Sequence, residues 1–403
     1  MTPEELGFDS NRLDHIGAMG RRYVDDGKLP CSVVQVARRG EVVYRDAYGQ
    51  ADLASQTPVS EDTIFRIYSM TKPITSIVLM QLYEEGELLL ENPVERYLPA
   101  FADMRVWSGG SDQAPQSVPA TRTMTIRDIL THTSGLTYGF LRQHPLDAIY
   151  RQHKLGDFVV APYSLSEAVE RLASLPLLFE PGTSWNYSMS TDVCGAVIEA
   201  ITGQTLAEAF AERVLGPLGM NDTGFWVQPA NASRLASSYA RGGDGKLMQI
   251  DAGATSPYLQ PPPMLSGGGG LVSTLDDYQR FCSMLLAGGT LDGNRIIGRK
   301  TLDYMAKNHL PGGALLNELG QSLFSEVAME GQGFGLGFSV IIDPAANGTV
   351  SSAGEYAWGG AASTAFWIDP VEELTVIFLT QLIPSSTYPL RRQLRAAVYQ
   401  ALL

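Results

Sequence analysis

Apolar residues recur at helical and then at strand spacing in the first fifty residues of the chain. Over residues 9–26 they recur every three or four positions and stop at a Gly-Lys-Leu-Pro sequence, which predicts an amphipathic helix. Two runs rich in β-branched residues follow, Cys31–Ala37 and Glu41–Tyr48, around an Arg-Arg-Gly turn. This arrangement predicts a β-hairpin. The chain therefore opens as helix, strand, strand.

Helical patterns dominate the middle of the chain. One begins after Ser69 and continues along one face as far as Gly86, with a proline that the first turn of a helix tolerates. The others cover Ile126–Leu130, Ser166–Leu175, Asp192–Ile201, Leu206–Leu215 and Leu275–Leu286. By contrast, Trp107–Ser117 is poor in apolar residues and rich in turn formers, which predicts a long exposed loop.

Strand patterns return only near the end of the chain, before a closing helix over Arg391–Leu402. The predicted strands cover Gly335–Ile342, Thr349–Tyr356, Ser363–Ile368 and Leu374–Thr380, with a hairpin turn between the last two. Strands at both ends with helices between them predict an α/β (α+β) fold, in which the two termini build one antiparallel sheet flanked by helices.

This order of elements also suggests how the chain divides into domains. We expect residues 1–90 and 287–403 to form the α/β domain and residues 91–286 to form an inserted, mostly helical domain. A cleft between two such parts is the usual place for a binding site, so we expect the active site there.

Composition narrows the possible partners. Of the 403 residues, 44% are hydrophobic and 18% are charged, which is enough apolar material for a large core. The net charge is -14 and there is no basic block, so nucleic acid and anionic membranes are not expected as partners. The first residues lack a signal-peptide profile, and no apolar run approaches the roughly 20 residues that span a bilayer. These features predict a cytoplasmic protein.

The cysteines and histidines suggest neither a disulfide framework nor a metal site. Three cysteines, far apart in the chain, fit buried reduced thiols. Five histidines show no paired-ligand spacing. We therefore expect no metal and no cofactor.

One Ser-x-x-Lys sequence occurs in the chain, at Ser69 and Lys72. At the start of a helix this spacing puts both side chains on one face, where an uncharged amine could take the proton of the hydroxyl and make it a nucleophile. The amides at the helix start would favour developing negative charge. The pattern alone fits an exposed helix start equally well.

Two further segments add candidate chemistry. Residues 180–188 form a turn-rich stretch in which Tyr187 could relay a proton, although any one of 17 tyrosines is more often a packed side chain. Residues 356–361, Tyr-Ala-Trp-Gly-Gly-Ala, end a predicted strand, and paired glycines there would let a substrate approach the backbone. A β-bulge or a turn explains the same glycines.

Together, the three segments resemble the active-site motifs of the serine-reactive penicillin-binding fold, the superfamily of class C β-lactamases, D,D-peptidases and family VIII carboxylesterases. Other segments are similar to the family as well, among them 130–136, 268–274 and 335–338. The resemblance runs from about residue 30 to residue 381 and implies a β-lactamase-like fold. The nucleophile elbow sequence Gly-x-Ser-x-Gly of α/β-hydrolases is absent.

The resemblance implies a role for each matching residue. Ser69 would be the nucleophile, Lys72 its proton acceptor and Tyr187 the second proton carrier. The backbone amides of Ser69 and Ala361 would form the oxyanion hole. The Trp358-Gly359-Gly360 element would contact the substrate.

Two departures from the β-lactamase pattern narrow the activity. Met189 stands two residues after the tyrosine, where those enzymes have an asparagine that hydrogen-bonds a substrate amide. Trp358 stands where they have Lys or His to attract a substrate carboxylate, and it fits an apolar acyl or alcohol group better. Both changes match the carboxylesterase branch, which implies hydrolysis of short-chain or small carboxylic esters through an acyl-enzyme intermediate.

Two more residues near these motifs have expected positions. His132 is expected to be a structural hydrogen-bonding residue rather than a general base, and Tyr138 is expected to face the cleft.

Three alternatives to an esterase stay open. The same site would serve an acyltransferase, or a β-lactamase or D-amino-acid peptidase, and a penicillin-binding-like protein that has lost catalysis would keep the fold as a binding protein. A small-molecule ester is the expected partner, and the sequence leaves the oligomeric state open.

Overall fold

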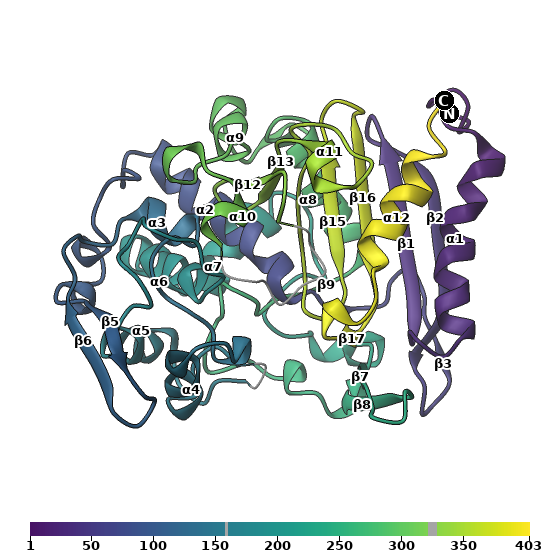
Figure 1. The fold of residues 1–403 in the computed structure, drawn as a ribbon. Helices are drawn as coiled ribbons and strands as arrows, with labels where there is room; N and C mark the ends of the chain where they lie inside the picture. Colours follow the sequence, from purple (N-terminus) through teal and green to yellow (C-terminus); the bar gives the residue numbers. More distant parts are fainter. Residues whose placement is uncertain (158–159, 321–328) are drawn as a thin grey trace.

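The computed structural model describes residues 1–157, 160–320 and 329–403 and contains a large antiparallel sheet (Figure 1). The strands of this sheet follow the order β12-β13-β14-β15-β16-β1-β2-β3. Their bounds are β1 Cys31–Arg38, β2 Glu41–Asp52, β3 Thr57–Pro58, β12 Gln332–Phe334, β13 Ser339–Ile341, β14 Tyr356–Gly359, β15 Ala365–Asp369 and β16 Leu374–Leu379. Because β1 pairs with both β2 and β16, the two ends of the chain share one sheet, as the sequence predicts.

Helices cover both faces of this sheet. Val34 and Val36 of β1 join α1 (Ser10–Asp25) and α12 (Leu390–Tyr399) in one hydrophobic cluster. Val33, which points the other way because strand side chains alternate, belongs to the main core with α2 (Thr71–Glu84) and α8 (Leu275–Leu286). α8 packs on β15 and β16. Figure 1 shows α1 and α12 side by side, with both chain termini at their end.

The remaining helices lie mostly between α2 and α8 in the sequence. α6 packs directly against α2, which brings the chain around residue 187 close to the start of α2. The bounds are α3 Ile126–Leu130, α4 Pro145–Gln152, α5 Leu165–Ala173, α6 Ser190–Thr202, α7 Leu206–Phe210 with a π-helical turn Ala211–Leu215, α9 Arg299–Met305, α10 Leu316–Leu319 and α11 Pro344–Asn347.

The expected long loop at Trp107–Ser117 is wrong. The chain forms a β-hairpin there, with Val106 opposite Val118 and Trp107 opposite Ser117. Val106 is buried, and its backbone also bridges Leu177, so contacts with a distant segment anchor this strand pair in a polar sequence. The small sheets outside the large one comprise β4 Phe65–Arg66, β5 Arg105–Gly110, β6 Pro115–Pro119, β7 Ser238–Arg241, β8 Leu247–Asp251, β9 Val272–Ser273, β10 Thr290–Leu291, β11 Asn294–Arg295 and β17 Leu382–Ile383.

Two other expectations about strands are also wrong. The strand expected at Thr349–Tyr356 is absent, because α11 ends at Gly348 with a positive φ, Gly354 also has a positive φ, and β14 starts only at Tyr356. Strands also occur before the C-terminal region, since β7 and β8 pair over residues 238–251. The division into 1–90 and 287–403 against 91–286 stays a prediction.

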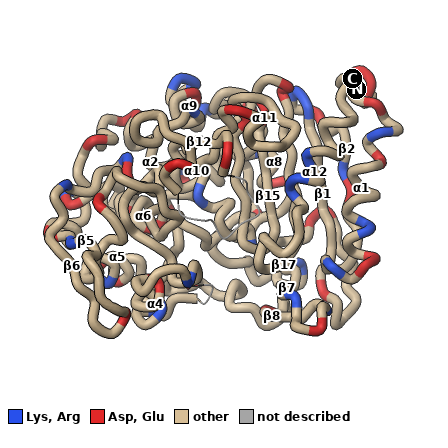
Figure 2. The backbone as a smooth tube through the Cα atoms, in the orientation of Figure 1, with Lys and Arg blue, Asp and Glu red and all other residues tan. Residues whose placement is uncertain are grey.

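Charges are dispersed over the molecule. Figure 2 shows Lys and Arg interspersed with Asp and Glu along the chain. All three cysteines are buried and unpaired, as expected. Within the described ranges, no helix combines the length and apolar character needed to cross a membrane.

Candidate active site

The backbone presents Ser69 at a sharp turn between β4 and α2. β4 is held by pairing with β9, and a 3₁₀ turn over Tyr68–Met70 leads directly into α2. Tyr68 has a φ of 44°, in the left-handed region that costs a non-glycine residue about 1–3 kcal/mol. The sequence predicts the pair at the start of a helix; Ser69 lies in the turn just before α2, which begins at Thr71, and Lys72 lies in its first turn.

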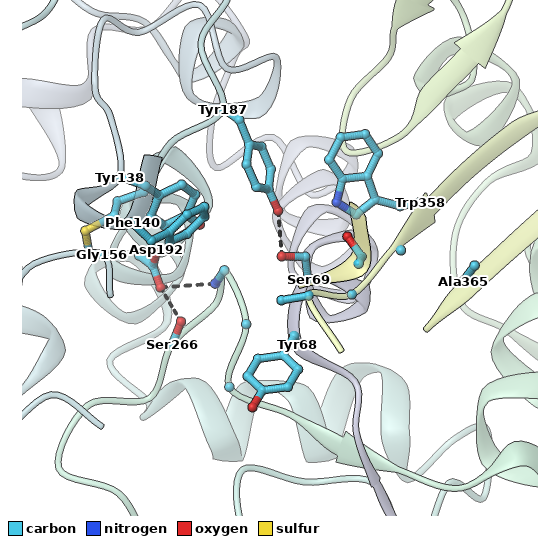
Figure 3. A pocket seen from close by; sticks show the side chains of 18 of the residues that line it. Tyr68, Ser69, Tyr138, Phe140, Gly156, Tyr187, Asp192, Ser266, Trp358 and Ala365 are labelled. Atoms are coloured by element: carbon cyan, nitrogen blue, oxygen red, sulfur yellow. Dashed lines mark hydrogen bonds between the residues drawn. The ribbon is translucent and has the colours of Figure 1, made fainter. Parts of the chain in front are cut away.

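The hydroxyl of Ser69 contacts the two other predicted proton carriers. Lys72 Nζ donates a hydrogen bond to Ser69 Oγ at 3.2 Å, and the Tyr187 hydroxyl donates to the same oxygen at 2.5 Å. Figure 3 shows the phenol of Tyr187 reaching down to Ser69. Lys72 and Tyr187 are both buried. The structure thus brings together Ser69, Lys72 and Tyr187, although Ser69 and Tyr187 are 118 residues apart in the sequence.

Lys72 is held by two oxygen atoms besides the serine. It donates to the backbone carbonyl of Gly268 at 2.6 Å and to the hydroxyl of Tyr138 at 3.0 Å. Its amine also lies 4.5 Å from the ring centre of Tyr187. Tyr138 therefore faces the cleft, as the sequence suggested, but its hydroxyl touches Lys72. Burial raises the pKa of Tyr138 well above its ordinary value, so this hydroxyl is neutral near pH 7.

Asp192 is a site residue that sequence reasoning missed. Its carboxylate accepts hydrogen bonds from Ser266 Oγ at 2.5 Å and from the Gly268 amide at 3.1 Å, which fixes the loop whose carbonyl holds Lys72 (Figure 3). Burial raises the pKa of Asp192, while the nearby charge of Lys72 opposes that change. The available signal was an acidic residue in the first turn of a helix, directly before an uninterrupted apolar stretch over residues 193–198.

Trp358 stands on β14, on the pocket wall beside Tyr187. Its ring centre lies 5.5 Å from that of Tyr187 and 5.3 Å from that of Phe334, with an edge-to-face angle of 88° to the latter. Such pairs fix the orientation of an indole ring. Trp358, Gly359, Gly360 and Ala361 all line the same pocket as Ser69.

The paired glycines are required by the protein itself. A Cβ atom on Gly360 would lie 2.3 Å from the carbonyl oxygen of Ile67, and one on Gly359 would lie 2.2 Å from the guanidinium of Arg391. Gly360 also donates to the carbonyl of Thr364 at 2.9 Å, which closes a tight turn. The glycines therefore let the end of β14 pack against the segment that precedes Ser69.

The rest of the pocket is mainly apolar. Met189, at the start of α6, is buried and contributes a thioether where a hydrogen-bonding amide would be needed for a peptide-like substrate. Further apolar lining comes from Phe140, Tyr163, Phe225 and Met264. Pockets of this kind bind small molecules through apolar contacts and a few polar groups.

His132 lies behind the catalytic candidates rather than among them. It is buried, and its Nδ1 lies 3.2 Å from Ser188 Oγ. Its ring packs against Tyr187 and Trp185 at 5.0 and 6.0 Å between centres. Burial lowers the pKa of His132 well below its ordinary value, so the ring is neutral. This geometry fits the structural role expected from the sequence.

Comparisons with known proteins place this geometry in a family. The family model described as Beta-lactamase matches residues 18–400. The chain is 36% identical to Esterase EstB of Burkholderia gladioli over 416 aligned residues, which covers 99% of this chain and 98% of that protein. It is 35% identical to Protein Rv1367c of Mycobacterium tuberculosis, over 92% of this chain and 90% of the relative.

Solved structures agree with the sequence comparisons. EstCE1, described as a hydrolase with promiscuous acyltransferase activity, superposes with a TM-score of 0.81 at 27% identity, over 96% of this chain and 99% of that one. Simvastatin synthase LovD from Aspergillus terreus has the same fold, with a TM-score of 0.81 at 23% identity over 97% and 98% of the two chains. This chain therefore belongs to the β-lactamase family.

Proposed function

We propose that this protein is a serine carboxylesterase of the family VIII type, which hydrolyses small carboxylic esters through an acyl-enzyme. The observation that carries the proposal is the position of Ser69 Oγ, on a pocket wall and within hydrogen-bonding distance of both Lys72 and Tyr187. Activation of a serine hydroxyl needs an adjacent group that accepts its proton, and the Lys72 amine is in position to do so, with Tyr187 as a second proton carrier.

The acylation step would begin with attack of Ser69 Oγ on the ester carbonyl carbon. Lys72, in its uncharged amine form, takes the serine proton, because its amine already contacts the hydroxyl. The carbonyl oxygen becomes an oxyanion, which the backbone amides of Ser69 and Ala361 would stabilise. The positions of both residues on the pocket wall support this assignment.

The leaving group and the second half of the reaction involve Tyr187. Its hydroxyl, 2.5 Å from Ser69 Oγ, donates a proton to the departing alkoxide. The proton that Lys72 took from the serine then passes to the Tyr187 phenolate, beside which the lysine amine lies, 4.5 Å from the ring centre. Water then attacks the acyl-enzyme, the same groups take its proton, and Ser69 is released with its hydrogen restored.

Esters are favoured over β-lactams as substrates by the residues of the pocket. Met189 offers no hydrogen bond to an amide, and Trp358 offers no charge to a carboxylate. The relatives that support this choice include Esterase EstB and, at 29% identity, Lovastatin esterase of Penicillium rubens.

The test is turnover of p-nitrophenyl butanoate together with intact-mass detection of a butanoyl adduct. We expect Ser69→Ala to lower kcat by roughly 10⁴- to 10⁶-fold and to abolish the adduct, the scale seen when a covalent nucleophile is removed. Unchanged turnover in this variant would end the proposal.

Acyl transfer to an alcohol is the second candidate function, because EstCE1 is described as a hydrolase with acyltransferase activity. The same acyl-enzyme would form, and the acceptor would replace water. Product analysis with added alcohol decides between the two. Nitrocefin turnover tests the β-lactamase alternative, and failure of a fluorophosphonate probe to label Ser69 would favour a catalytically inactive binding protein. A cytoplasmic location stays a prediction.

A further inference from the structure

The indole N–H of Trp358 is a buried hydrogen-bond donor that has no acceptor among the described residues. The side chain is only 8% exposed. Buried polar groups in native proteins are almost always paired, and one without a partner calls for an explanation. The indole nitrogens of Trp185 and Trp367 are also unpaired, but these side chains are wholly buried. Trp358 differs because it stands on the wall beside Ser69.

The surroundings of Trp358 fix where its donor points. Tyr187 and Phe334 pack against the ring, so the indole cannot turn freely. In Figure 3 the indole nitrogen lies on the edge of the ring that faces Ser69 and Tyr187. A substrate held for attack by Ser69 would therefore lie next to the ring edge that carries the indole nitrogen.

We propose that Trp358 is a specificity-determining residue, whose indole N–H donates a hydrogen bond to a second, neutral oxygen of the ester substrate, separate from the scissile carbonyl. The inference rests on the proposed function and adds a substrate class to it. That class is small esters with an ether, ester or hydroxyl oxygen near the reacting group. Binding such an oxygen supplies the acceptor that the described residues do not offer.

A neutral oxygen is favoured over a carboxylate by the charges around the site. Indole carries no charge, and a buried carboxylate needs an opposite charge to offset its desolvation. The ammonium of Lys72 is already surrounded by oxygen atoms of Ser69, Tyr138 and Gly268. Of the arginines that line the same pocket, Arg391 donates to the carbonyls of Gly360 and Thr364, and Arg395 pairs with Glu355. A neutral acceptor needs only the hydrogen bond.

The test compares substrate pairs that differ by one oxygen in place of one methylene. p-Nitrophenyl methoxyacetate against p-nitrophenyl butanoate probes the acyl side, and 2-methoxyethyl acetate against butyl acetate probes the alcohol side. For each pair, the ratio of kcat/KM is measured in the wild type and in Trp358→Phe, which keeps an aromatic ring and removes the donor. Dividing the two ratios cancels the intrinsic reactivity of the substrates.

We expect the wild-type ratio to exceed the Trp358→Phe ratio by about 3- to 10-fold for one pair, the value of one neutral hydrogen bond. Trp107→Phe, on β5 and away from the residues that line the pocket, is the matched control and should leave both ratios unchanged. Equal ratios in wild type and Trp358→Phe for both pairs would overturn the inference. The proposed function would survive that result, because it depends on the loss of turnover in Ser69→Ala.

A second measurement does not depend on folding of the Trp358 variant. The five tryptophans give five indole N–H signals in a proton–nitrogen correlation spectrum, and single Trp→Phe replacements assign them. In Ser69→Ala saturated with ethyl methoxyacetate or 2-methoxyethyl acetate, we expect the Trp358 signal to move downfield relative to ethyl butanoate or butyl acetate. The same shift with and without the ether oxygen would contradict the inference.

Discussion

The two walls of the pocket differ in how their polar atoms are paired. On one wall the amine of Lys72 and the hydroxyls of Ser69, Tyr138 and Tyr187 form a continuous hydrogen-bonded group. On the adjoining wall, formed by β14, the indole N–H of Trp358 has no acceptor among the residues that the structure describes. A hydrogen-bonded network can pass protons between its members, whereas an unpaired donor can only bind an acceptor atom that a ligand supplies. The first wall thus fits catalysis and the second fits selection of the substrate.

After loss of the nucleophile, the largest loss of activity among the hydrogen-bonded residues around Ser69 is expected for Lys72→Ala. Removal of the amine takes away the proton acceptor of Ser69, and general acid–base groups contribute up to about 10⁴-fold. We therefore expect kcat/KM for p-nitrophenyl butanoate to fall by about 10⁴. Lys300→Ala, whose side chain is 84% exposed on α9, is the matched control and should stay within about threefold of the wild type. Substantial activity in Lys72→Ala would show that another group takes the serine proton.

Tyr187→Phe and Tyr138→Phe compare the role of a hydroxyl that contacts Ser69 with that of a hydroxyl that contacts Lys72. Each substitution removes one hydroxyl and keeps the ring. Only the Tyr187 hydroxyl contacts Ser69, so we expect a loss of about 10³ in kcat for Tyr187→Phe and about tenfold for Tyr138→Phe. Steady-state kinetics on one ester would measure both. Equal losses would mean that Tyr187 acts only by holding Lys72.

These residues were not equally accessible to sequence reasoning. Ser69 and Lys72 could be predicted because three residues of separation on helical geometry determine a contact by themselves. Tyr187 and Trp358 came from a family resemblance, since nothing local indicates that a loop and a distant strand meet at the serine. The contact of Lys72 with the Gly268 carbonyl could not be predicted, because a backbone oxygen carries no side-chain signal. Its position also depends on Asp192, which is 76 residues away in the sequence.

The fold shows the same division between local and distant determinants. The opening helix and hairpin and the β15–β16 hairpin follow from periodicity and turn residues, and β1 does pair with β16. The β5–β6 hairpin could not be predicted, because its polar strands are fixed by the burial of Val106 and the bridge to Leu177. The strand predicted at Thr349–Tyr356 is absent, because the composition of the segment does not indicate the positive φ of Gly348 before it and of Gly354 within it.

Asp192→Asn tests whether the carboxylate acts through the Gly268 loop. Asparagine keeps an oxygen of similar shape but loses the charge, so its hydrogen bonds from Ser266 and Gly268 weaken. We expect about a tenfold lower kcat with KM changed less than threefold. An unchanged kcat would indicate that the carboxylate does not act on the catalytic step.

His132 gives the smallest predicted effect and concerns stability rather than rate. Burial and the charge of Lys72 lower its pKa in the folded protein well below 6.5. Below pH 6.5 the unfolded chain binds a proton at this histidine while the folded protein does not. The free energy of unfolding therefore falls as the pH falls, by up to about 1.4 kcal/mol per pH unit from this group.

Urea denaturation of the wild type and His132→Gln at pH 7.5 and 5.0 measures this contribution. Glutamine does not titrate, so the other groups cancel in the difference between the two proteins. We expect the stability advantage of the wild type to shrink by about 2 kcal/mol between the two pH values. His15→Gln, at an exposed position on α1, is the control and should leave the pH dependence unchanged. If the stability advantage of the wild type stays constant with pH, His132 takes up a proton in the folded state. Its ring would then belong with Lys72 and Tyr187 among the groups that can carry a proton in the site.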